Sequence, residues 1–184
     1  MLKTLELLRK RRSIRQFTPE PLTSAQMECL QEIALRSPSS RALTPWHFVF
    51  VTDTDTLHAL GQAKAHGCAF LQQCALAVVL CADPQRSDVW IEDCSLAATL
   101  LHLGATDMGL GSCWVQIRER QHDEKTDSET YVRSVLKIPA QMRVHAIIGI
   151  GNPAEEKHGH TADTLPAERI HLDQFDPQRL LPTS

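Results

Sequence analysis

Residues 75–108, ALAVVLCADPQRSDVWIEDCSLAATLLHLGATDM, contain the two segments that decide the fold. Residues 75–82 are apolar without interruption, which is typical of a strand covered on both faces. Residues 88–108 predict the longest helix, and no formally charged residue occurs in it between Cys94 and Thr106. A helix with apolar side chains around its circumference is buried in a core or between subunits. A covered strand followed by such a helix predicts helices packed on the faces of a central sheet.

Shorter elements surround this pair. Strands are expected at residues 46–52, 112–117 and 143–150, where β-branched and apolar residues gather. Helices are expected at residues 1–10, 23–36 and 126–138, and one or two short helices broken at a glycine are expected within residues 57–73. Capping boxes are expected at Thr23 with Gln26 and at Thr126 with Glu129. The fold class expected is therefore α+β, as a single domain over residues 1–184.

Composition excludes several classes of protein. The 184 residues include 19 Lys and Arg and 22 Asp and Glu, a net charge of 19 − 22 = −3, which argues against a general nucleic-acid partner. The longest apolar run, Cys74–Ala82, is less than half of the about 20 residues that a membrane span requires. The first residues do not resemble a secretory signal, so we expect a cytoplasmic protein with no membrane partner. The six cysteines are interpreted as reduced, mostly buried side chains.

The cluster Arg11-Arg12-Ser13-Ile14-Arg15 carries the most chemistry. It follows a helix and precedes Pro19, so we expect residues 12–17 to be extended, with Arg11, Ser13 and Arg15 on one face. Two guanidinium groups and a hydroxyl suit a phosphate monoester, because arginine donates forked, charge-assisted hydrogen bonds. The same residues also fit a solvated basic turn, where cations favour the end of a helix. The residues alone leave both interpretations open.

No catalytic acid, base or nucleophile and no metal site emerges from the remaining residues. Residues 149–154 match G-x-G-x-x-A formally, but Pro153 and the absence of a helical pattern make this a chance match. His158 and His160 lack a nearby third ligand and are interpreted as surface histidines. His102 is interpreted as a buried or interface histidine with a satisfied hydrogen bond. Such a pattern is typical of an enzyme whose chemistry resides in a cofactor.

Four blocks, taken in order along the chain, resemble the nitroreductase family. They are RRSIRQF at residues 11–17, SPSS at 37–40 followed by PWHFV at 45–49, WIEDCS at 90–95 leading to GLGSCW at 109–114, and GIGNPAEEK at 149–157. The resemblance extends from about Leu5 to Phe175. It implies an α+β nitroreductase-like fold with a central, mostly antiparallel sheet. It also implies an intertwined homodimer that binds FMN at its interface, with a C-terminal segment that reaches across the partner.

The resemblance also implies which residues bind FMN. The residues matching the family's phosphate and ribityl contacts are Arg11, Arg12, Ser13 and Arg15. Lys157 matches the basic residue that closes on the phosphate. His160 stands close to where the family often has another cation, and if it takes that role, phosphate binding weakens as rising pH removes its charge.

The flavin ring is implied to lie against two further segments. Pro38, Ser39 and Ser40 would come from the other subunit and pack near the ring. Val115 and Gln116 match the backbone that lies beside the ring near its N5 atom. The family's S-x-N-x-Q-P-W loop is replaced by residues 40–46, SRALTPW, which lack both amides, and this departure puts the ring contacts of the loop in doubt.

The activity implied is an NAD(P)H-dependent FMN oxidoreductase. NAD(P)H would reduce the flavin and leave, and a small-molecule electron acceptor such as a nitroaromatic, a quinone or an activated alkene would then use the same pocket. No side-chain acid or base is required for this sequence of events. The missing loop amides motivate one alternative, an FMN-binding or redox-sensing protein with little turnover. A flavin enzyme of the same fold with different chemistry, and an interaction domain without a cofactor, are further alternatives.

Overall fold

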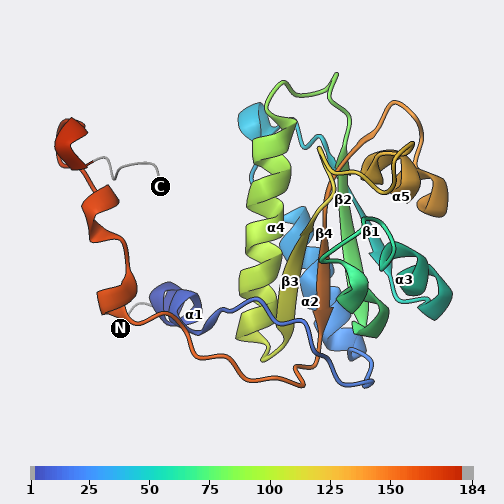
Figure 1. The fold of residues 1–184 in the computed structure, drawn as a ribbon, viewed down its shortest axis with the longest axis horizontal. Coiled ribbons are helices and arrows are strands. Elements are labelled where there is room, and N and C mark those ends of the chain that lie inside the picture. The colour runs from blue at the N-terminus through green and yellow to red at the C-terminus, as the bar shows by residue number, and fades with distance from the viewer. Residues whose placement is uncertain (1–2, 180–184) are drawn as a thin grey trace.

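Strand β2 (Leu76–Ala82), whose residues are all buried, lies inside a four-stranded sheet of order β1-β2-β4-β3 (Figure 1). The other strands are β1 (Trp46–Val51), β3 (Gly111–Gln116) and β4 (Arg143–Gly151). All three strand pairings are antiparallel. The computed structural model describes residues 3–179. The strands expected from the sequence are therefore confirmed, each to within a residue or two of its ends.

Helices cover both faces of this sheet. They are α1 (Lys3–Lys10), α2 (Ser24–Leu35), α3 (Thr54–Leu60), α4 (Trp90–Asp107) and α5 (Ser128–Leu136). Leu76 and Val78 of β2 join the hydrophobic cluster that contains residues of α2 and α4, whereas Ala77 and Val79 join the cluster that contains residues of α3 and α5. Because alternate residues of a strand point to opposite faces, an uninterrupted apolar strand supplies both clusters.

Helix α4 is the longest helix of the described residues, and it is only partly covered. Ala97, Ala98 and Leu101 are fully buried against the sheet and α2. Gly104 lies so close to Ile33 of α2 that a β-carbon at this position would overlap the isoleucine side chain. Leu96, on the outer side of the helix, is nonetheless 49% exposed. The sequence predicts burial nearly all round, and the single chain leaves one side of the helix uncovered.

The starts of two helices test the capping predictions. At α2 the predicted box is present, with the Gln26 N–H donating to Thr23 Oγ1 (3.2 Å) and the Thr23 N–H donating to Gln26 Oε1 (2.9 Å). At α5 the prediction is wrong by one residue, because Asp127 is the cap and accepts the Thr130 N–H at 2.7 Å. The Glu129 carboxylate, which the predicted box would have used, forms an ion pair with Arg143 instead.

The chain after β4 leaves the body of the protein. It passes below α1 and forms the short 3-10 helices η3 (Ala162–Thr164), η4 (Ala167–Arg169) and η5 (Pro177–Arg179), which stand apart from the sheet in Figure 1. Large apolar side chains of this segment are exposed, including Ile170 at 65% and Leu172 at 83%. Within residues 3–179, no helix combines the length and the apolar character needed to cross a membrane.

Candidate functional site

The segment that follows α1 is extended, as predicted, and lies along the outer edge of β3. Ser13 forms a parallel bridge with Ser112, and the Ile14 N–H donates to the Ser112 carbonyl at 3.0 Å. Ile14 and Phe17 are buried and anchor the segment in the core. A β-carbon at Gly111 would lie 2.8 Å from Ile14, so this glycine permits the close approach.

The segment that follows β4 runs beside the same extended stretch. The Thr18 N–H donates to the Asn152 carbonyl and the Ala154 N–H donates to the Gln16 carbonyl, both at 2.9 Å. Residues 12–18 and 152–158 are therefore neighbours, although more than half of the chain separates them in sequence. Their meeting point is the start of β3, at the lower end of the sheet in Figure 1.

Three of the predicted phosphate-binding residues meet at this point. Lys157 Nζ donates to the Ser13 carbonyl at 3.1 Å. The Ser13 hydroxyl, Arg15 and Lys157 all lie close enough to the Cys113 thiol to influence its ionisation. Burial raises the pKa of Cys113, and the two cations and the hydroxyl oppose this rise. The structure thus brings Ser13, Arg15 and Lys157 together around the buried Cys113.

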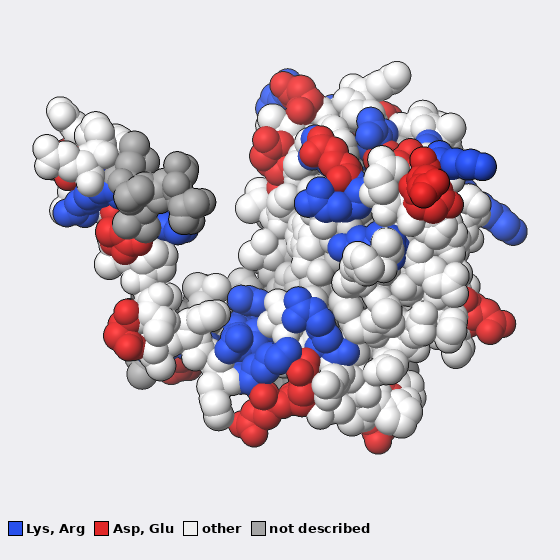
Figure 2. Space-filling view, viewed as in Figure 1, with Lys and Arg blue, Asp and Glu red and all other residues white. Residues whose placement is uncertain are grey.

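Two other predicted cations lie beside this group, and His160 does not join it. The Arg12 guanidinium donates to the His158 carbonyl. Arg11 lies near His102 and contributes to lowering the pKa of that histidine. Figure 2 shows Lys and Arg side chains gathered in one patch over this region, between α1 and the lower end of the sheet. His160 is exposed, and no hydrogen bond or ion pair links it to another described residue.

Glu155 connects the two segments, a role that sequence reasoning missed. Its Oε1 atom accepts the Arg15 N–H at 2.6 Å and the Gln16 N–H at 3.3 Å, and it forms an ion pair with Lys157 Nζ at 2.9 Å. The Arg15 N–H and, next, the Lys157 ammonium hold the pKa of Glu155 below its ordinary value. The GIGNPAEEK block contains this residue, but the block does not reveal which of its two adjacent glutamates makes the contacts.

Val115 and Gln116 lie further along β3. The Val115 side chain is fully buried in the core, so only its backbone is available to a ligand. The Gln116 amide is held at both ends, because its Oε1 accepts the Trp114 indole N–H at 3.0 Å and its Nε2 donates to the Arg118 carbonyl at 2.9 Å. Three to four residues of strand separate this pair from Ser112, which corresponds to about 10–13 Å.

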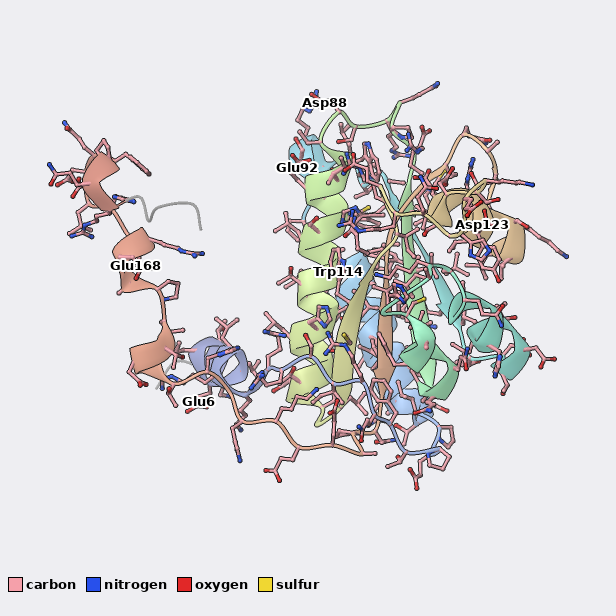
Figure 3. The ribbon with its side chains drawn as sticks, viewed as in Figure 1. Glu6, Asp88, Glu92, Trp114, Asp123 and Glu168 are labelled. Atoms are coloured by element: carbon pink, nitrogen blue, oxygen red, sulfur yellow. The ribbon has the colours of Figure 1, made fainter. Side chains whose placement is uncertain are left out.

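Pro38, Ser39 and Ser40 lie at the opposite end of α4 from the cations. Ser39 Oγ accepts the Thr44 N–H at 2.8 Å, and the Ser40 N–H donates to the buried Asp93 carboxylate at 2.8 Å, which fixes the loop to the first turn of α4. Figure 3 places Glu92 at this end of the helix and Trp114 midway along β3. An 18-residue helix is about 27 Å long. A single chain therefore does not bring this loop to the cation cluster.

Two histidines lie between α4 and the sheet, His145 buried and His102 partly exposed, and both are neutral at pH 7. His145 Nε2 lies 3.0 Å from Ser95 Oγ, whose own hydrogen is donated to the Ile91 carbonyl, so Nε2 carries the proton of this pair. Burial lowers the pKa of His145 to about 4. His102 Nδ1 lies 2.7 Å from Ser112 Oγ, and burial lowers its pKa to about 4 as well. His102 therefore has a hydrogen-bond partner, as expected, but in the single chain it is partly exposed rather than buried.

Three of the buried cysteines are poor nucleophiles at neutral pH. Burial raises the pKa of Cys74 and Cys94 to about 12 and that of Cys81 to about 11, so these thiols remain protonated. All six cysteines are free, and five are buried, the exception being Cys29. Among residues 3–179, no group of three or more His, Cys, Asp and Glu side chains is placed to hold a metal ion.

A cavity of about 670 Å³ opens elsewhere, at the lower end of β1 and β2. Its lining includes Phe17, Leu57, Gln72 and Cys74, and none of the predicted site residues contributes to it. Side chains that can bind an anion are found instead at the edge of β3. The geometry of the predicted residues, rather than the size of this cavity, therefore locates the candidate site.

Comparison with known proteins gives consistent matches over most of the chain. The model of the nitroreductase family matches residues 8–90 and 62–152. A relative from Archaeoglobus fulgidus is 31% identical, over 98% of this chain and 97% of its own length. An NADPH-flavin oxidoreductase from Vibrio harveyi is 34% identical, over 95% of this chain and 75% of its own length. The structure of an FMN-dependent nitroreductase from Clostridium difficile superimposes with a TM-score of 0.91 and 38% identity, covering 93% of this chain and 99% of that one.

Proposed function

The chain belongs to the nitroreductase family, and from this membership we propose that it is an FMN-dependent oxidoreductase that uses NAD(P)H to reduce small electrophiles such as nitroaromatics and quinones. The observation that carries the proposal is the convergence of Arg12, Ser13, Arg15 and Lys157 at the start of β3. We call these four residues the phosphate cradle. Two guanidinium groups, an ammonium group and a hydroxyl form a donor set suited to a phosphate monoester.

The cradle residues fit the phosphate of FMN in chemistry and in availability. Within residues 3–179, no hydrogen bond or ion pair occupies the Arg15 guanidinium, and this side chain is exposed. Lys157 Nζ donates to the Ser13 carbonyl and the Arg12 guanidinium donates to the His158 carbonyl, so both cations are already held in place. Donors held in this way need little rearrangement when an anion binds.

The flavin ring would extend from the cradle along β3 toward Val115 and Gln116. The Gln116 amide, held by Trp114 and by the Arg118 carbonyl, keeps this end of the strand in a defined conformation. Bound FMN would supply the hydride chemistry, and the chain would orient it and exclude water. Since that chemistry resides in the cofactor, no side chain is required as an acid or base.

A second copy of the chain would complete the site. The loop at Pro38, Ser39 and Ser40 is fixed to the far end of α4, so it can approach a flavin only on another subunit. The uncovered side of α4 at Leu96 and the exposed apolar residues of the C-terminal segment support a homodimer. The single-domain interpretation over residues 1–184 belongs to the same proposal, with the C-terminal segment packing on the partner rather than forming a unit of its own.

The test of the proposal is spectroscopic. The purified protein is expected to be yellow, with a flavin spectrum that bleaches under anaerobic conditions when NADH or NADPH is added. Steady-state kinetics with a quinone or a nitroaromatic should give parallel lines in double-reciprocal plots, because both substrates use one pocket in turn. A colourless protein that takes up no FMN would overturn the proposal, and bound flavin that NAD(P)H reduces only very slowly would favour the FMN-binding protein without turnover.

A further inference from the structure

We propose that Glu155 is a positioning residue that assembles the phosphate cradle and thereby determines the preference of the site for FMN over flavins without a phosphate. This inference rests on the proposed function and deepens it. Glu155 would not touch the cofactor. It would act through Arg15 and Lys157, which it holds in the geometry that the phosphate requires.

The contacts of Glu155 are concentrated on one atom. Oε1 accepts the backbone N–H groups of Arg15 (2.6 Å) and Gln16 (3.3 Å) and pairs with Lys157 Nζ (2.9 Å). The Glu155 side chain is 17% exposed, so most of its surface is covered by these partners and their neighbours. A single carboxylate oxygen therefore contacts both the backbone from which the Arg15 side chain projects and the Lys157 ammonium.

Backbone hydrogen bonds join the two segments at Gln16 and Thr18, and Glu155 adds the side-chain link between Arg15 and Lys157. Arg15 and Glu155 are 140 positions apart, and neither belongs to a helix or a strand. The neighbouring contacts, from Lys157 to the Ser13 carbonyl and from Arg12 to the His158 carbonyl, cross between the same two segments. Glu155 is the acidic side chain among these contacts. Its removal leaves Lys157 with one acceptor fewer and the Arg15 N–H without its acceptor.

A purely electrostatic role for Glu155 predicts the opposite change in FMN affinity, so the direction of that change tests the inference. The lowered pKa of Glu155 keeps its carboxylate charged at neutral pH, close to where a phosphate dianion would bind. If Glu155 were only a neighbouring charge, replacing it with a neutral residue would remove a repulsion and tighten FMN binding. If it is a positioning residue, the same replacement weakens FMN binding.

The experiment titrates flavin-free protein with FMN and with riboflavin and follows the quenching of flavin fluorescence. For Glu155→Ala, which removes the acceptor together with the charge, we expect FMN affinity to fall about tenfold or more, the loss of a charge-assisted hydrogen bond, while riboflavin affinity stays the same. Glu156→Ala is the matched control. Glu156 is exposed and makes no hydrogen bond or ion pair with any residue that the structure describes, so both affinities should remain as in the wild type.

Each outcome separates this inference from the proposed function. A wild-type protein that binds neither flavin overturns the proposed function itself. A wild type that binds FMN, together with a Glu155→Ala variant that binds FMN equally or more tightly, overturns only the role of Glu155. Equal losses for FMN and riboflavin would also overturn it, because they indicate a general structural role. If Glu155→Ala does not fold, Glu155→Asp decides. Its shorter side chain should give an intermediate loss for FMN alone, and full wild-type affinity would refute the inference.

Discussion

Replacing Arg15 with alanine tests the phosphate cradle directly, because the structure separates the two roles of this residue. Its backbone N–H is bonded to Glu155 and is retained in Arg15→Ala, whereas its exposed guanidinium is removed. The fold and the arrangement of Lys157 should therefore persist. The lost guanidinium would have donated charge-assisted hydrogen bonds to the phosphate, which are worth about 1.5–3 kcal/mol. FMN affinity should consequently fall by about 10- to 150-fold.

The assay is fluorescence titration of flavin-free protein, repeated at two salt concentrations. The affinity of the wild type should fall more steeply with salt than that of Arg15→Ala, because the variant has one cation fewer to be screened. Lys125→Ala is the control, since Lys125 is exposed in the loop before α5, away from the cradle. An Arg15→Ala variant that retains FMN with unchanged affinity would refute the assignment of this residue to the phosphate.

Three further predictions concern stability, pH and assembly. Ile147→Ala removes a fully buried side chain of β4 and should lower the free energy of unfolding by about 2–5 kcal/mol in urea denaturation, whereas a loss under 1 kcal/mol would contradict the packing described. Burial lowers the pKa of His145 to about 4 from an ordinary 6.5, so as the pH falls the unfolded chain binds a proton at this residue before the folded chain does, and the free energy of unfolding should decrease from pH 6.5 toward pH 4. In His145→Gln this decrease should be shallower, and an unchanged dependence of the free energy of unfolding on pH would exclude His145 as its source. Leu96→Glu puts a charge on the uncovered side of α4 and should shift the protein from dimer to monomer in sedimentation analysis, and a variant that remains fully dimeric would exclude this surface from the interface.

The elements were predictable because their signals are local. An unbroken apolar run identified β2, and Thr23 with Gln26 identified the start of α2, since each depends on residues within one turn or one strand. The start of α5 was misplaced by one residue because a local signal does not distinguish between two neighbouring residues that can both act as caps. Thr126 and Asp127 are both good caps, and only the ion pair of Glu129 with Arg143, a residue of β4, removes the alternative.

The candidate site was predictable in its residue types and much less in its arrangement. The motif around Arg12, Ser13 and Arg15 indicated phosphate binding, and its extended conformation is confirmed. Nothing near Glu155 in the sequence distinguishes it from Glu156, and only the pairing of two distant segments gives one of them a role. His145 was missed because a single histidine in an apolar strand carries no local signal of its partner.

The α+β class, the position of each strand and the residues able to bind an anion follow from the sequence, because hydrophobic periodicity and side-chain chemistry are properties of short segments. The tertiary structure alone decided which of these residues meet. It placed Lys157 and Arg15 on one carboxylate, left His160 outside the group, and fixed the Ser40 loop to the far end of α4. These outcomes depend on the order and register of the whole sheet, which sets where chain segments emerge and which distant backbone groups become partners.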